Sequence, residues 1–153
     1  MILRVTPVIQ PSVRELCRRP YPGHPHGCPN HGHRQTCPPS APLYHAIYDI
    51  SKPVFAIVTE FDLAAHVAAM REKHPGWSDA QLRCCLYWQP RARMAQKAAV
   101  HEFLCDHPGY RVETVPEAMG VNVTVTMKAA GIELEWPPVH LARQVALGAL
   151  PRK

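Results

Sequence analysis

Three cysteines near the start of the chain, Cys17, Cys28 and Cys37, are candidate metal ligands. The segment around them, 17–42, reads CRRPYPGHPHGCPNHGHRQTCPPSAP, which holds too much proline and glycine to form a helix or a central strand. Loops of this length without secondary structure are usually either disordered or functional. Because thiolates can order a loop by binding a metal, the sequence predicts a metal-binding loop over 17–42.

The sequence around these cysteines favours an iron–sulfur cluster and leaves zinc open. Ten residues separate Cys17 from Cys28 and eight separate Cys28 from Cys37, which is wider than the paired spacing of compact zinc sites. Cys28 and Cys37 each precede a proline, as occurs beside iron–sulfur ligands, so a cluster is the leading expectation. Four histidines in the loop are also donors that suit zinc: His24, His26, His31 and His33.

The elements that must position this loop begin with strands. Four segments have the alternation or β-branched content of strands, namely 2–9, 54–58, 132–136 and 145–147. The first is expected to be an edge strand that ends before Pro11. The run 54–58 is apolar throughout, which predicts a strand buried on both faces.

Three capping residues predict helix starts. Asp62 can cap a helix after the 54–58 strand, and Ser78 with Gln81 forms a capping box. Asn122 can cap a helix that ends at Gly131. The segment 121–126 also has the alternation of a strand, and the helix is favoured.

The helix expected from Ser78 contains a proline and a cysteine that matter for the site. Pro90 is expected to kink this helix or to restart it, with helix again over 91–104. Cys85 shares a predicted helical face with Leu82 and Leu86, so we expect it to be a small core residue. His101 and Cys105 are four residues apart, a spacing that permits joint ligation but is more typical of packing.

Length and composition indicate one globular domain. A chain of 153 residues with 46% apolar and 19% charged residues can bury a single core. We therefore expect 1–153 to be one α+β domain, a small mixed α/β fold. In it a short sheet is flanked by helices, and the long N-terminal loop is organised by a metal.

Charge and hydropathy indicate the expected cellular location of the protein and its expected binding partners. The sequence has no signal-peptide pattern and no apolar run long enough to cross a membrane, so we expect a cytoplasmic protein without a membrane partner. In that compartment the six cysteines are expected to be thiols or ligands. The net charge of +5 permits contact with a nucleic acid or a protein partner, although the basic residues are scattered.

Two blocks of sequence carry a family resemblance. One is GCPNHGHRQTCPP at 27–39, and the other is CDHP at 105–108 followed by VPEAMGVNVTVTMKAAGIELEW at 115–136. They resemble a prokaryotic and phage family of uncharacterised, cysteine-rich, predicted metal-binding proteins with a Cys…Cys-Pro…Cys-Pro-Pro loop. Longer members of that family are richer in cysteine before the Cys-x-His-Pro element. The resemblance implies metal ligands at Cys17, Cys28, Cys37 and Cys105.

Two classes of function follow from these ligands. In an iron–sulfur protein, four cysteine ligands would close the cluster for a structural or electron-transfer role, whereas three would leave one iron open to a substrate. Whether the protein is an enzyme stays open, and no catalytic residue is assigned. The alternative is a zinc-stabilised module that contacts a nucleic acid or a protein partner.

Overall fold

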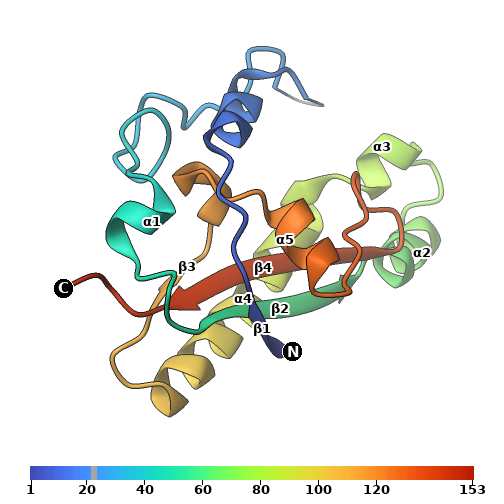
Figure 1. Ribbon diagram of the computed structural model, residues 1–153. Coiled ribbons are helices and arrows are strands. Elements are labelled where there is room, and N and C mark those ends of the chain that lie inside the picture. The colour runs from blue at the N-terminus through green and yellow to red at the C-terminus, as the bar shows by residue number, and fades with distance from the viewer. Residues whose placement is uncertain (22–23) are drawn as a thin grey trace.

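A four-stranded antiparallel sheet is the centre of the computed structural model, which describes residues 1–21 and 24–153 (Figure 1). The strand order is β1-β2-β4-β3. The long strands β2 (Val54–Asp62) and β4 (Leu141–Ala149) pair at the centre, and the short strands β1 (Ile2–Val5) and β3 (Arg111–Glu113) lie at the edges. With the helices that cover this sheet, the expected α+β class is confirmed.

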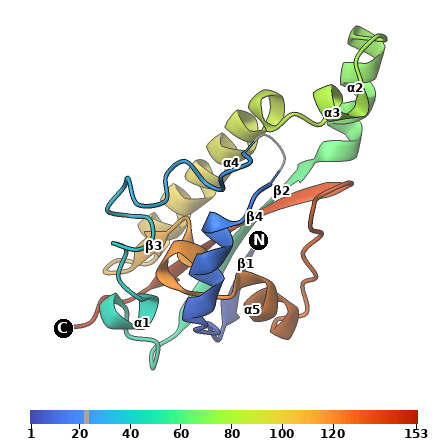
Figure 2. The same cartoon turned by 90° about the horizontal axis from the view of Figure 1, so that it is seen from above.

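Helices cover both faces of the sheet (Figure 2). The long helix α4 (Cys85–Asp106) lies on one face. The other face carries α1 (Tyr44–Ile47), η2 (Pro116–Met119) and α5 (Val123–Ala129), and η1 (Pro11–Arg18) packs on η2. Beyond the end of β2 follow α2 (Leu63–Lys73) and α3 (Asp79–Leu82).

The two-sided burial of β2 over 54–58 agrees with the uninterrupted apolar sequence of that run. Val54, Ala56 and Val58 face the α1, η2 and α5 side, where they join the larger core cluster. Ile57 points the other way and packs with Phe103 of α4 and with Ala146 of β4. Because successive strand residues alternate between faces, a strand covered on both sides must be apolar at every position.

The three predicted helix caps are confirmed. Asp62 accepts a hydrogen bond from the Ala65 amide at 2.8 Å, and Asn122 accepts one from the Val125 amide at 3.0 Å. Ser78 and Gln81 form the reciprocal capping box. Each cap is a local interaction over three residues, which is why it can be predicted without the fold.

The predicted strand at 132–136 is wrong. Ile132 and Leu134 do pack against the core, as their alternation suggests, but the segment forms no ladder. Instead, the Glu135 carboxylate accepts hydrogen bonds from the amides of His140 and Leu141, at 2.8 and 3.2 Å, so the chain folds back into a loop. The edge strand is also shorter than expected, since β1 ends at Val5.

The helix break before α4 differs from the expectation, and it moves Cys85 out of the core. The break falls at Arg83 and Cys84, between α3 and α4, and Pro90 lies inside α4. The Trp88 indole donates to the Arg83 carbonyl at 3.2 Å and holds this turn. Leu82 is fully buried, whereas Cys85 after the break is exposed. The expectation that Cys85 is a core residue is therefore wrong.

The closest approach between α4 and the sheet occurs where Phe103 packs on Gly148. A Cβ atom at Gly148 would lie only 2.6 Å from Cε1 of the fully buried Phe103 ring. No side chain fits between the helix and the strand here, so glycine is required for this packing distance.

Substituting Gly148→Ala should therefore destabilise the protein by about 1–3 kcal/mol, because it overpacks the contact with Phe103. The free energy of unfolding can be measured by urea denaturation with circular dichroism. Gly76→Ala is the matched control, since a Cβ there meets no atom within 4 Å. Equal stabilities of the two variants would contradict the assigned role of Gly148.

Candidate metal centre

The first two loop cysteines are joined directly through the backbone. Cys17 lies in the last turn of η1, and its carbonyl accepts a hydrogen bond from the Cys28 amide at 2.7 Å. Gly27 makes this approach possible, because its φ is +82° and a Cβ there would lie 2.6 Å from the Cys17 carbonyl oxygen. The chain is thus back at η1 by Cys28, which lies beside Cys17.

Tight turns connect Cys28 to Cys37. The His31 amide donates to the Cys28 carbonyl at 3.1 Å, and the Gly32 amide donates to the Pro38 carbonyl at 2.8 Å. The second bond joins the turn after Cys28 to the Cys37-Pro38 step. The turn that follows Cys28-Pro29 therefore lies next to the Cys37-Pro38 step.

Arg14 of η1 binds the C-terminal end of the loop. Its guanidinium donates to the carbonyls of Pro39 and Ala41, at 2.7 and 2.9 Å. The described part of the loop thus has hydrogen bonds of its own, which the sequence did not predict. These contacts orient the loop before any metal binds.

The three loop thiols lie within electrostatic reach of one another. Partial burial raises the pKa of the Cys17 thiol, and the neighbouring Cys28, Cys37 and Glu117 raise it further when they are charged, while the Arg14 guanidinium lowers it. All three cysteines are half-buried and none forms a disulfide. The raised pKa means that the Cys17 thiol is protonated at neutral pH unless a cation binds it.

Glu117 is a carboxylate that sequence reasoning missed. It lies on η2, which packs against η1, and it is close enough to affect Cys17. Although part of the Glu117 side chain is exposed, the surrounding protein raises the pKa of its carboxyl group. Glu117 is within the VPEAMG stretch of the sequence, but no local pattern connects it to a cysteine 100 residues earlier.

A cavity of about 580 Å³ opens beside Cys17 and Cys28. Its lining includes all four loop histidines, His24, His26, His31 and His33. The thiols of Cys17 and Cys28 and four imidazoles therefore line one shared space. Among the described residues, no three cysteine, histidine or carboxylate side chains already stand close enough together to hold one ion.

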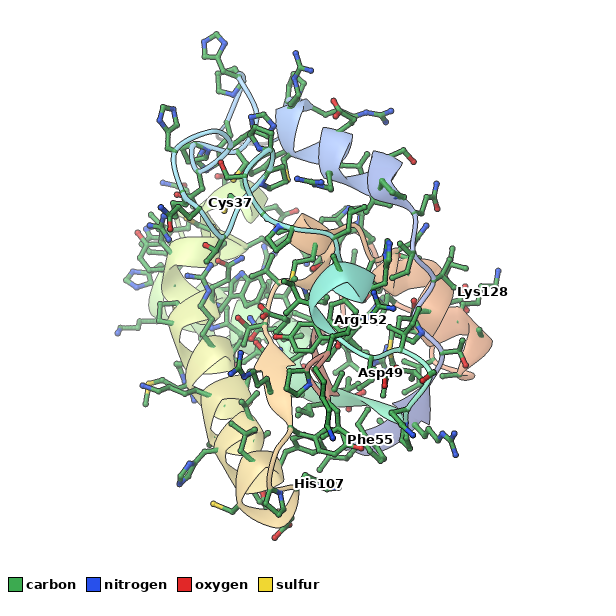
Figure 3. The ribbon with its side chains drawn as sticks, turned by 60° about the vertical axis from the view of Figure 1, so that its left-hand side comes forward. Cys37, Asp49, Phe55, His107, Lys128 and Arg152 are labelled. Carbon is green, nitrogen blue, oxygen red and sulfur yellow. The ribbon has the colours of Figure 1, made fainter. Side chains whose placement is uncertain are left out.

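The structure does not bring Cys105 to the other implied ligands. It lies exposed in the last turn of α4. Figure 3 shows His107, two residues further on, at the opposite end of the molecule from Cys37. His101 is exposed on the same helix.

No family model matches the chain, and comparisons with curated proteins and with solved structures give no match. The family resemblance of the loop therefore stays a prediction. In the part of the chain that the structure describes, even α4 lacks the combination of length and hydropathy that spanning a lipid bilayer requires.

Gly27→Ala should open the loop, because alanine must adopt a left-handed φ and its Cβ would meet the Cys17 carbonyl. Limited trypsin digestion should then cut after Arg18 and Arg34 several-fold faster than in the wild type. Gly32→Ala is the matched control: its φ of +75° costs the same kind of strain, but its Cβ meets no atom within 4 Å. If both variants are cut equally fast, the Gly27 contact does not hold the loop.

Proposed function

We propose that this protein binds a metal centre through the thiolates of Cys17, Cys28 and Cys37, and that the centre is an iron–sulfur cluster. The observation that carries the proposal is the hydrogen bond of the Cys28 amide to the Cys17 carbonyl, which brings two half-buried cysteines together at one cavity. The resemblance of the same loop to predicted metal-binding proteins motivates the choice of a metal.

The chemistry of the donors supports a metal over a purely structural role. A loop that is structural alone has little use for three free, half-buried thiols. Metal binding would release the thiol protons, and the thiolates that form would be held by the charge of the cation. The Arg14 and Gly27 contacts lower the entropy that must be lost when the loop closes on the metal.

The size and spacing of the site support a cluster over a single ion. Its cysteines come from well-separated points of the loop, and the cavity is far larger than one ion needs. A cluster has several irons that separate cysteines can bind, and it supplies electron transfer or, with one iron open, a position for a substrate. Cys17, Cys28 and Cys37 would hold it, while Arg14 would place positive charge beside the anionic sulfurs.

The second candidate is a zinc-stabilised interaction module. It is favoured by the four histidines of the cavity lining, because imidazole nitrogen is a good zinc ligand. In this case the metal contributes folding free energy and no chemistry. Arg18, which also lines the cavity, and the overall positive charge would face an acidic protein or a nucleic acid.

Protein purified without air should be brown and should contain iron and acid-labile sulfide in comparable amounts. Metal and sulfide analysis with visible absorption measures this directly. Colourless protein with about one zinc per chain would favour the second candidate. Protein with neither metal, even after reconstitution with iron and sulfide or with zinc, would overturn both.

Cys37→Ser should abolish metal binding, because a hydroxyl replaces a soft thiolate ligand. His26→Gln should leave iron content unchanged if a cluster is bound, but should lower zinc content if the histidines are ligands. Retention of full metal content by Cys37→Ser would exclude the loop as the site.

A further inference from the structure

Most of the net positive charge of the chain belongs to one segment, 71–97, which runs from the end of α2 through α3 into α4. It has six Lys or Arg residues and two Asp or Glu residues, so it carries +4 of the net charge of +5. Arg71 pairs with Asp79 at 2.6 Å. In the described part of the chain, the other five cations form no ion pair: Lys73, Arg83, Arg91, Arg93 and Lys97.

Three aromatic rings contact one another in the same segment. The Trp77 amide donates to the His74 carbonyl at 3.0 Å, and this turn stacks the two rings with centroids 4.0 Å apart and planes 9° apart. The Tyr87 ring, near the start of α4, has its centroid 5.2 Å from that of Trp77. Tyr87 is 50% exposed, and the other two residues are half-buried, so a ligand can reach this stack.

The stack is held in place by the packing of α2, α3 and α4, which lie together at one end of the molecule (Figure 2). Trp77 packs against the apolar cluster that these helices share. The capping box of Ser78 and Gln81 begins α3 directly after Trp77, and the ion pair of Arg71 with Asp79 joins α2 to α3. A ligand that stacks on these rings therefore loses little affinity to the ordering of the protein.

Unpaired cations flank the rings. Arg91 follows Tyr87 by four residues on α4, so the two side chains are neighbours on one face of the helix. Lys73 directly precedes His74. Proteins that bind single-stranded nucleic acids use this combination, in which bases stack on aromatic rings while Lys and Arg contact the phosphates.

We infer that this aromatic and basic surface binds single-stranded nucleic acid. The surface consists of Lys73, His74, Trp77, Tyr87 and Arg91, none of which lines the cavity beside Cys17 and Cys28. The inference is therefore independent of the proposed metal centre. An acidic protein or an anionic membrane would also be attracted by the charge, but neither offers a flat ring at every unit to match the stack. In a duplex the faces of the bases are already stacked on one another, so only the phosphates would contribute.

Binding can be measured by the fluorescence anisotropy of a labelled oligothymidylate of about 20 nucleotides, which is longer than the usual site size. Tyr87→Ala should weaken binding by about tenfold, because it removes a stacking ring. Tyr87→Phe should bind like the wild type, since the ring stacks without its hydroxyl. Arg91→Gln should lower the slope of log affinity against log salt concentration by about 0.7, the value for one phosphate contact on a single strand.

Two cations outside the surface provide matched controls. Arg152 is exposed beside α1, where its amide donates to the Ile47 carbonyl at 2.8 Å, and Arg18 lines the cavity of the cysteine loop. Arg152→Gln and Arg18→Gln should both keep the salt slope of the wild type. Thermal denaturation followed by circular dichroism checks that Tyr87→Ala folds.

Several results would overturn the inference. Wild-type protein that does not bind the oligonucleotide at low salt would refute it, as would equal affinities of Tyr87→Ala and the wild type. A larger loss in Arg18→Gln than in Arg91→Gln would place the nucleic acid at the cysteine loop. Tighter binding of the matching duplex, or of vesicles of phosphatidylserine and phosphatidylcholine, would assign the surface to a different partner. Absence of iron and zinc from the protein would instead refute the proposed function and leave these expectations unchanged.

Discussion

The contact between the Phe103 ring and Gly148 determines how closely α4 lies on the sheet. Ile57 and Ala146 complete this small cluster, so both central strands are in contact with the helix at one place. The N-terminal half of the same helix is held by a second cluster, in which Trp88 and Ala92 pack with Leu82 and Ala142. Two separate packing contacts therefore fix the orientation of α4 on the sheet.

The cysteine loop, unlike α4, is not held in place by apolar packing. The loop is held to η1 by hydrogen bonds from the Arg14 guanidinium and from the Cys28 amide, and by the close approach of Gly27, rather than by a hydrophobic core. Such polar contacts can be broken and reformed at modest cost, unlike apolar packing.

Sequence reasoning succeeded where the deciding interaction is local. Asp62, Ser78 and Asn122 each bond to an amide three residues away, so their helices could be predicted. The strand at 54–58 could be predicted because a strand that is buried on both faces requires apolar residues throughout. At 132–136 the alternation correctly indicated which side chains pack on the core. The strand prediction failed there because strand pairing depends on residues far away in the sequence.

For the candidate site, the sequence singled out Cys17, Cys28 and Cys37, whose role as ligands stays a prediction, but not the residues that surround them. Glu117 and Arg14 reach the site through the packing of η1, η2 and the end of the loop, which no sequence spacing reveals. The expectation for Cys85 was wrong because the helix breaks at Arg83 and Cys84, a break stabilised by the Trp88 indole, and this turns Cys85 and Leu86 to solvent.

The packing of η1 on η2 links the loop to the main core. The Gln10 amide donates to the Gly120 carbonyl at 2.7 Å, and Met119 beside it is part of the large core cluster. A metal held by Cys17 would thus add its binding free energy to the stability of the whole domain. The metal-free form would unfold more often and would therefore be degraded faster by cellular proteases. The concentration of this protein in a cell would then rise and fall with the concentration of that metal, without a dedicated regulator.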